Sequence, residues 1–404
     1  MKICKLFLPL FFVAAQFVQV LCVAEEAGKP CRKRNLGHDS FVCVCSAEYC
    51  DSPDPPGDVS GHKMVYYVSD KLAHRLAKFE NDDANRQNAN NEFEVRVDAS
   101  QKRQTIFGFG GAFTDAAGIN LNALSGRTRD ALLKTYFDQK IGIGYTVGRV
   151  PIASCDFSTR EYSYLDTPDD FNMTTFAAPP GWMKSNGQMS KDGQLKGTVD
   201  GQYYRLYAQY LKSDFASQIL VPMLKTSAQT EQLKIIAHDD QRDILLESAE
   251  KLFSDQNGLN VIDGLGVHWY KHSSFAALTL THNLYPDKFL LATEACHGDL
   301  PWEHRPLLGD WLRGWAYGHD ILNNLRNWVV GWTDWNLCLD LKGGPNWVGN
   351  LVDAPIIVNA TSDEFYKQPI RFVPPNSVVL STSLFTSNGT QLEDSPIENV
   401  HSNS

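Results

Sequence analysis

Five short apolar runs between residues 143 and 336 end in polar or aromatic side chains, and this arrangement constrains the fold more than any other feature. Segments with helical periodicity separate several of the runs, among them SGRTRDALLKTYFDQ, where Leu132, Leu133 and Phe137 share a face. Short strands alternating with helices predict an α/β fold with a parallel sheet. The runs are IGYTVGRVPI, LKIIAHDD, DGLGVHWY, KFLLATEAC and NWVVGWTDWN, ending around Arg149, Asp239 and Asp240, His268 and Tyr270, Glu294, and Asp334, Trp335 and Asn336.

The run KFLLATEACHG raises the question of whether its carboxylate is catalytic. Phe289, Leu290 and Leu291 predict a buried strand, and Glu294 places a carboxylate at its end. A single strand can end this way simply because loops are polar. Five strand ends with reactive or hydrogen-bonding groups favour instead a (β/α) barrel, whose chemistry occurs at the carboxyl ends of its strands.

The N-terminal 24 residues are expected to be a secretory signal peptide. Lys2 and Lys5 precede an apolar run that starts at Leu6, and cleavage is expected near Ala24. A membrane-spanning helix is the weaker interpretation, because Gln16 and Gln19 interrupt the run before it reaches bilayer length. No later segment has transmembrane length, so the mature chain is expected in the secretory pathway, in the lysosome or outside the cell.

The net charge of −10 argues against a nucleic-acid-binding surface, because nucleic-acid binders cluster lysine and arginine. Four cysteines fall within 20 residues, a spacing that would also suit zinc, but exported chains more often form disulfides, and two bridges are expected. Three glycosylation sequons fit export. The cysteines are Cys31, Cys43, Cys45 and Cys50, and the sequons begin at Asn172, Asn359 and Asn388.

The sequence pattern divides the chain into four parts. Residues 25–105 lack long helical periodicity, and EFEVRVDA alternates apolar and charged residues, which predicts a small antiparallel β unit. Residues 106–369 hold the alternating strands and helices. Residues 370–404 form a polar, divergent tail rich in Ser, Thr and Asn, for which loose order is expected. The signal peptide, residues 1–24, completes the division.

The motifs of the chain occur in the order found in the lysosomal glucocerebrosidases, retaining β-glucosidases that cleave glucosylceramide. The resemblance spans roughly residues 31 to 369 and rests on long motifs. These are the cysteine cluster, GFGGAFTDAAGIN, RVPIASCDFS, DTPDDF, VHWY, TEAC, VVGWTDWNL, GGPNW and FYKQP. The resemblance implies a (β/α)8 TIM-type barrel with an accompanying β domain.

The resemblance also implies roles for individual residues. Glu294 matches the catalytic nucleophile, which bonds to the anomeric carbon to form a glycosyl-enzyme. Groups that hold the glucose ring are matched by Asp115, Trp335 and Asn350, and groups around the nucleophile by Arg149, His268 and Tyr270. The implied disulfides pair Cys31 with Cys43 and Cys45 with Cys50. No metal or organic cofactor is implied.

The chain departs from the family pattern at the acid/base residue. A retaining glycosidase uses a second carboxyl group about 5 Å from the nucleophile, and the family places it in an Asn-Glu-Pro motif after the fourth strand. No such motif follows here, and the matching segments join between Lys212 and Ser213. A second gap lies near MTTFAAPPGWMKSNG. The barrel is therefore expected to lack matches to its third and fourth strands, and Asp239 or Asp240 is a poor substitute acid by strand order.

Two hypotheses follow. The first is a glucosylceramidase that uses Glu294 on glucosylceramide at a membrane surface, with a saposin-type activator as partner. The second is a non-catalytic relative that binds glucosides or the activator protein, because the acid/base segment is absent.

Overall fold

The computed structural model describes residues 28–57, 63–82, 100–151, 154–162, 185, 196, 232–254, 256–300, 302–303 and 305–369. The expected signal peptide, the EFEVRVDA strand, the polar tail and the sequons at Asn172 and Asn388 lie outside these residues.

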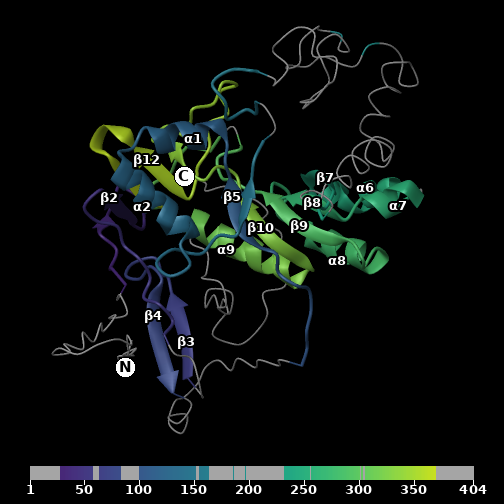
Figure 1. The fold of residues 1–404 in the computed structure, drawn as a ribbon, viewed down its shortest axis with the longest axis horizontal. Helices are drawn as coiled ribbons and strands as arrows, with labels where there is room; N and C mark the ends of the chain where they lie inside the picture. The colour runs from purple at the N-terminus through teal and green to yellow at the C-terminus, as the bar shows by residue number, and fades with distance from the viewer. Residues whose placement is uncertain are drawn as a thin grey trace, which may run out of the picture.

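A six-stranded parallel sheet forms the centre of the molecule, in the order β6-β5-β10-β9-β8-β7 (Figure 1). The α/β barrel prediction is confirmed, and every predicted run ends its strand where expected. Within the described part of the chain, β6 and β7 are the two edges of this sheet. The strands are β5 (Gly108–Ala112), β6 (Val147–Arg149), β7 (Ile236–Gln241), β8 (Gly264–His268), β9 (Phe289–Glu294) and β10 (Val329–Asp334).

Helices make the crossovers that parallel strands require. Between β5 and β6 lie α1 (Asp115–Asn122) and α2 (Gly126–Phe137); after β7 come η4 (Arg242–Ile244), α6 (Leu245–Leu252) and α7 (Gln256–Val261). Then α8 (Phe275–Leu284) precedes β9, and α9 (Trp311–Arg326) precedes β10. Side chains cap three of these helices, since Thr114, Ser125 and Asp310 each accept a hydrogen bond from a first-turn N–H.

The predicted helix in SGRTRDALLKTYFDQ is α2. Its buried side chains Thr128, Leu132 and Tyr136 recur every four residues and so share one face. That face packs against the second sheet of the molecule. The Tyr136 hydroxyl donates to the Leu337 carbonyl at 2.7 Å, which ties α2 to the chain just after β10.

The second sheet joins both ends of the described chain, in the order β1-β2-β13-β12-β11. The strand β2 pairs antiparallel with β13, so the N-terminal strands complete a sheet with residues from beyond the barrel. Both implied disulfides, Cys31–Cys43 and Cys45–Cys50, are present in it. A separate antiparallel ribbon pairs β3 (Lys63–Val68) with β4 (Ala77–Asp82). The remaining elements are β1 (Lys33–Arg34), β2 (Val42–Ser46), β11 (Leu339–Asp340), β12 (Ile356–Asn359), η5 (Ala360–Ser362) and β13 (Glu364–Lys367).

Aromatic side chains fill the space between the sheet and α9. Trp269, Trp332 and Tyr317 are each 1% exposed, and their rings meet at steep angles. The glycines of β5 and β10 let the strands approach closely: a Cβ on Gly110 would lie 1.9 Å from the Val147 carbonyl oxygen, and one on Gly331 would lie 2.3 Å from that of Gly108. A side chain at either position would force the neighbouring strand away.

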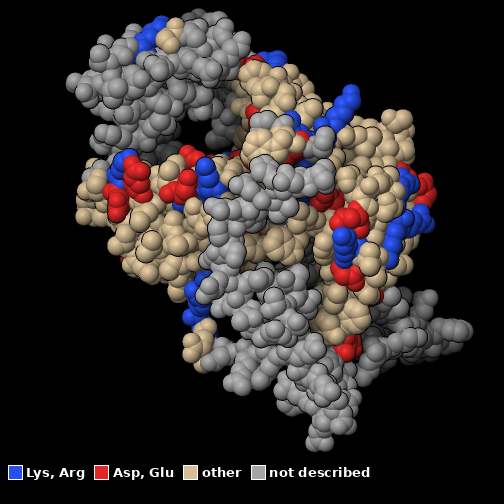
Figure 2. All heavy atoms as spheres, turned by 180° about the vertical axis from the view of Figure 1, so that it is seen from behind, with Lys and Arg blue, Asp and Glu red and all other residues tan. Residues whose placement is uncertain are grey.

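The surface of the described residues mixes both signs of charge. On the face shown in Figure 2, Lys and Arg atoms stand beside Asp and Glu atoms, with no broad basic area. None of the described helices is both long and apolar enough to cross a membrane.

Candidate functional site

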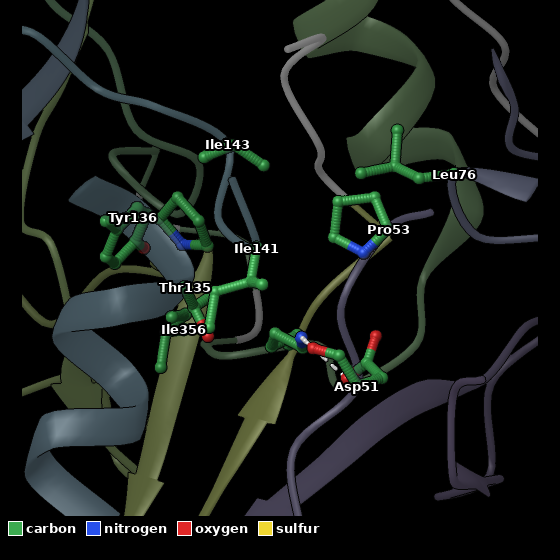
Figure 3. Close-up of a pocket in the computed structure, with 10 residues that line it drawn as sticks. Asp51, Pro53, Leu76, Thr135, Tyr136, Ile141, Ile143 and Ile356 are labelled. Atoms are coloured by element: carbon green, nitrogen blue, oxygen red, sulfur yellow. Dashed lines mark hydrogen bonds and ion pairs between the residues drawn. The ribbon is translucent and has the colours of Figure 1, made fainter. Parts of the chain in front are cut away.

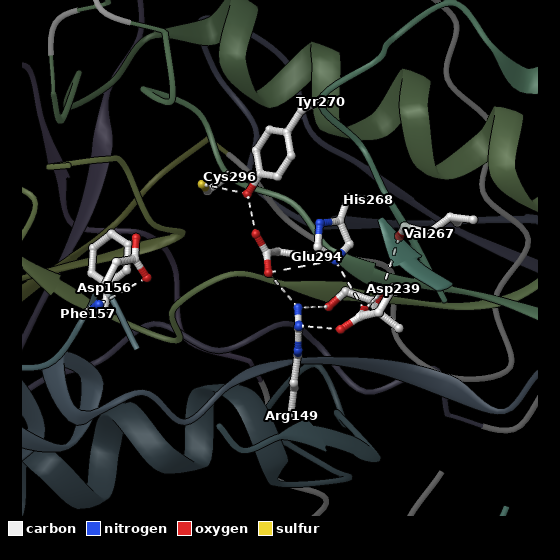
Figure 4. A network of polar contacts seen from close by, with 10 residues as sticks. Arg149, Asp156, Phe157, Asp239, Val267, His268, Tyr270, Glu294 and Cys296 are labelled. Carbon is white, nitrogen blue, oxygen red and sulfur yellow. Dashed lines mark hydrogen bonds and ion pairs between the residues drawn. The ribbon is translucent and has the colours of Figure 1, made fainter. Parts of the chain in front are cut away.

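Glu294 closes β9 and lies within a network of polar side chains at the carboxyl ends of the strands (Figure 4). Its Oε2 accepts a hydrogen bond from Arg149 Nη1 at 2.6 Å, and its Oε1 accepts one from the Tyr270 hydroxyl at 2.9 Å. The side chain is 16% exposed. Arg149 from β6 and Tyr270 from the segment after β8 thus orient both carboxylate oxygens, while the group stays accessible.

Tyr270 links Glu294 to the thiol of Cys296. The Tyr270 oxygen lies 3.2 Å from Cys296 Sγ. Because the single hydroxyl proton is used on Glu294, the thiol proton must be donated to the tyrosine oxygen. Burial raises the pKa of the Cys296 thiol well above its ordinary value, which keeps that proton in place. Burial likewise raises the pKa of Tyr270, so this residue acts as a donor.

Arg149 lies between two carboxylates. Its Nη2 binds Asp239 Oδ2 at 2.8 Å, and its Nη1 also donates to the Thr293 carbonyl at 3.0 Å. The second oxygen of Asp239 accepts from Thr293 Oγ1 at 2.7 Å and contacts His268 Nε2 at 3.1 Å. His268 Nε2 in turn lies 3.9 Å from Glu294 Oε2. Three strands, β6, β7 and β8, thus place charged groups around the carboxylate on β9.

Trp335 forms an aromatic wall beside this network. The guanidinium carbon of Arg149 lies 5.0 Å from the centre of its ring, and the ring of Phe157 meets it edge-on at 6.1 Å. Its backbone N–H donates to the Ala295 carbonyl at 2.7 Å, which fixes the segment after β10 against the segment after β9. Trp335 is 7% exposed and lies in an apolar cluster with Phe157, so little of its aromatic face is open to a sugar beside the carboxylates.

Asp156 is a second carboxyl group within electrostatic range of Glu294, and Figure 4 shows it to one side of the network. Its Oδ2 accepts from Asn350 Nδ2 and from Asn346 Nδ2, each at 3.4 Å. Burial raises the pKa of Asp156; the bond from Asn350 opposes this, and the charge of Glu294 adds to it. Asn350 therefore reaches the site through Asp156.

Asp115 is placed differently from the other sequence-predicted residues. It begins α1, and its Oδ2 accepts hydrogen bonds from the hydroxyls of Ser158 and Tyr162, both at 2.7 Å. These bonds fasten the loop that carries Asp156. Asp334, at the end of β10, is fully buried against the Tyr317 hydroxyl, and burial raises its pKa well above the ordinary value.

Three side chains of the network were not predicted as site residues: Asp156, Asp239 and Cys296. The motif RVPIASCDFS contains Asp156 between apolar residues, which was the available signal. Asp239 was considered only as a substitute acid. Its Arg149 and His268 partners come from other strands, and sequence spacing does not show such contacts.

Of the two described carboxyl groups near Glu294, Asp156 has a raised pKa, whereas Asp239 is held by its partners. Partial burial alone would raise the pKa of Asp239, but the bond from His268, the charge of Arg149 and the bond from Thr293 hold it well below the ordinary value. The residue groups with ligand atoms close enough for a metal ion combine Asp51 with disulfide-bonded cysteines, whose sulfurs carry no thiolate charge.

A small pocket lies away from this network, between α2 and the second sheet (Figure 3). Its lining is apolar except for Thr135 and the buried ion pair of Asp51 with Lys367, whose atoms lie 2.6 Å apart. Its volume is ≈ 30 Å³, whereas ligand sites usually enclose about 300–1,000 Å³. This pocket is too small for a sugar.

Comparison with known proteins agrees with the geometry. The chain is 34% identical to the lysosomal acid glucosylceramidase of Mus musculus over 450 residues, covering 91% of this chain and 85% of that protein. SrfJ from Salmonella typhimurium superposes with a TM-score of 0.64 at 27% identity, covering 76% of this chain and 82% of that one. An endo-β1,6-glucanase shares the fold, with a TM-score of 0.56 at 21% identity over 77% of this chain and 82% of its own.

The model of the TIM-barrel domain of glycosyl hydrolase family 30 matches residues 106–179 and 211–374. Both blocks contain groups of the network, Arg149 in the first and Glu294 in the second. The chain belongs to glycosyl hydrolase family 30 and is related within it to the glucosylceramidases.

Proposed function

We propose that this chain is a retaining β-glucosidase of the glucosylceramidase type, with Glu294 as its nucleophile. The observation that carries the proposal is the orientation of Glu294 by Arg149 and Tyr270 beside the Trp335 ring. An oxygen of Glu294 attacks the anomeric carbon, the bond to the leaving oxygen breaks, and that oxygen departs with the electron pair.

The substrate class follows from the relatives. Glucosylceramide, presented at a membrane surface with a saposin-type activator, is the proposed natural substrate, and the secretory pathway and lysosome are the proposed location. The two disulfides support this location, because they persist in oxidising compartments.

The leaving group decides how fast the first step runs. Ceramide leaves as an alkoxide unless it is protonated, and general acid catalysis contributes about 10²–10⁴-fold. The sequence lacks the Asn-Glu-Pro motif, and Asp239 is held ionised by its partners. The chain therefore cleaves activated aryl glucosides much faster than glucosylceramide.

The test is covalent labelling followed by mass spectrometry of the intact full-length chain. A fluorinated dinitrophenyl β-glucoside should add one fluoroglucosyl group to Glu294, because dinitrophenolate leaves without a proton. Azide should accelerate turnover of the unfluorinated compound, since this anion attacks the anomeric carbon without a general base and yields glucosyl azide. Glu294→Gln is the control and should remain unlabelled.

The second candidate is a glucoside-binding protein without turnover, favoured by the missing Asn-Glu-Pro motif and by the ion pair that occupies Asp239. Saturable glucoside binding without labelling would establish it and overturn the nucleophile assignment. Ordinary hydrolysis of glucosylceramide with no azide effect would show that an acid/base residue exists in the chain.

A further inference from the structure

The two edges of the six-stranded sheet are joined by one ion pair. In the described residues β6 and β7 lie at opposite ends of the strand order, yet Arg149 from β6 meets Asp239 from β7 with 2.8 Å between Nη2 and Oδ2. Glu294 lies next to this contact, because Arg149 Nη1 binds its Oε2. The contact that connects the sheet edges is thus also in contact with the proposed nucleophile.

The backbone of β7 is shaped to deliver the Asp239 side chain. His238 and Asp239 have φ angles of 71° and 50°, in the left-handed region that non-glycine residues rarely adopt, and the pairing of β7 with β8 shifts register between His238 and Asp240. Gly266 on β8 leaves the space, because a Cβ there would lie 3.1 Å from both Asp239 Oδ1 and Thr293 Oγ1. Strain of this kind persists where the surroundings enforce it, and it gathers at functional sites.

Each oxygen of Asp239 has a separate task. Oδ2 holds Arg149, and Oδ1 holds Thr293 Oγ1 and His268 Nε2. Arg149 and His268 are the two cationic or potentially cationic groups nearest Glu294 in the network. Removing the Asp239 charge would free the guanidinium from its second anchor and release His268 from its partner.

We infer that Asp239 is a positioning residue for glycosyl transfer, which acts by holding Arg149 and His268 against Glu294 across the two sheet edges. This inference rests on the proposed function of Glu294. Asp239 does not itself donate or accept a proton, and it touches no reacting atom; it fixes the direction of the Arg149–Glu294 bond and limits the net positive charge that Glu294 experiences.

The charge effect has a definite sign. Glu294 faces Arg149 from β6, His268 from β8 and Tyr270 from the segment after β8; the thiol of Cys296 contacts Tyr270, and Asp156 lies within electrostatic range. Without the negative charge of Asp239, the positive charge of Arg149 acts on Glu294 without being partly neutralised. A nearby positive charge stabilises the ionised carboxylate, so Glu294 attacks the anomeric carbon less readily.

The experiment compares Asp239→Asn with Asp240→Asn. Asp240 is the matched control: it is the next residue of the same strand, it is exposed, and its Oδ1 accepts only the backbone N–H of Gln241 among the contacts of that side chain that the structure records. Labelling of Glu294 by the fluorinated dinitrophenyl glucoside is followed at several concentrations and pH values. Melting temperature is recorded for both variants.

For Asp239→Asn we expect the maximal labelling rate to fall roughly 10- to 100-fold, the cost typical of misaligned reacting groups. The half-saturating concentration should change little, and the acidic limb of the pH profile should move to lower pH. Asp240→Asn should match the unmodified chain. Asp239→Glu, which keeps the charge, should return the acidic limb toward its original position even if its longer side chain recovers only part of the rate.

The outcomes distinguish failure of the proposed role of Glu294 from failure of the proposed role of Asp239. If the unmodified chain does not label, the proposed function of Glu294 fails. If the chain labels and Asp239→Asn labels at the rate of Asp240→Asn, Asp239 is not a positioning residue. A lower melting temperature for Asp239→Asn with an unmoved pH profile and an unchanged labelling rate in the folded fraction would assign Asp239 a purely structural role, and would overturn the inference as well.

Discussion

Two arginines at opposite edges of the sheet, Arg149 on β6 and Arg242 just after β7, make similar contacts but have different roles. Arg149 binds a backbone carbonyl and the carboxylates of Glu294 and Asp239, and its side chain is 26% exposed. Arg242 binds the Trp269 carbonyl at 2.8 Å and Asp320 at 2.6 Å, and its side chain is 1% exposed. The two arginines differ in exposure. The cluster of Arg149, Glu294 and Asp239, the accessible cluster, can be reached by a substrate, whereas the buried pair of Arg242 and Asp320 fixes α9 to the turn after β7.

The largest effect should come from the accessible cluster. Glu294→Gln removes the attacking oxygen's charge, so the labelling rate should fall by on the order of a thousandfold or more. Its melting temperature should stay close to that of the unmodified chain, because the amide keeps the shape of the side chain. Measurable labelling of this variant at another carboxyl group would break the comparison, since the accessible cluster would then not be the nucleophile's site.

For the buried pair of Arg242 and Asp320 we expect a loss of stability rather than a loss of labelling rate. Asp320→Ala leaves Arg242 charged in the interior, and breaking a buried pair in this way costs about 3–5 kcal/mol of unfolding free energy. Chemical denaturation measures it. The exposed pair of Glu247 with Lys251 is the control, because water screens this pair and Glu247→Ala should leave the stability nearly unchanged. Equal effects at the two sites would show that burial does not set the difference.

Tyr270 sharpens the comparison, since it is only partly buried, unlike Arg242, and bonds to the accessible cluster. Tyr270→Phe should lower the labelling rate roughly 10-fold, because Glu294 loses one of its two orienting donors. Tyr136→Phe is the counterpart: it deletes a buried hydroxyl that binds the Leu337 carbonyl. It should cost about 1 kcal/mol of stability and leave the labelling rate unchanged. A loss of labelling rate in both Tyr270→Phe and Tyr136→Phe would indicate that each substitution loosens the fold as a whole.

The smallest effect concerns Asp299, in the loop that follows Glu294. Burial, and next the charge of Glu303, raise the pKa of Asp299 from its ordinary 3.8 to about 6. The folded chain therefore holds a proton that the unfolded chain releases between these values, so this contribution to stability is full below pH 3.8 and is lost as the pH rises through about 6.

Asp299→Asn stays neutral throughout and should melt higher than the unmodified chain by about one or two degrees near neutral pH, with the gain vanishing in acid. Melting curves recorded across that range measure it. A gain that is the same at every pH would mean that protonation of Asp299 has no part in the effect.

The strand ends of the barrel could be predicted from sequence because each apolar run is followed by polar or aromatic side chains, although those that end β10, such as Asp334, are buried. Arg149, His268 and Glu294 all close their strands where the runs stop. The helix α2 followed from the spacing of its buried face. The disulfide pairing came from resemblance, since four cysteines allow more than one connectivity.

Contacts between strands could not be predicted in the same way. Asp239 reaches Arg149 because β7 shifts register and adopts an unusual backbone, and no residue type signals this. The role of Asp115 in holding glucose stays a prediction. The structure adds that its Oδ2 accepts hydrogen bonds from Ser158 and Tyr162, and that Asp156 lies within electrostatic range of Glu294; residue spacing indicates neither contact.

The pairing of β2 with β13 has a consequence for the order of events during synthesis. Arg34 binds Glu364, 330 positions later in the chain, and a ribosome adding about 5–20 residues per second takes roughly 15–65 seconds to bridge that interval. Until then β2 has no neighbour on that side. The Cys31–Cys43 bridge spans only 12 positions, so it can form early in synthesis. It then holds β1 and β2 together until β13 has been made and can pair with β2.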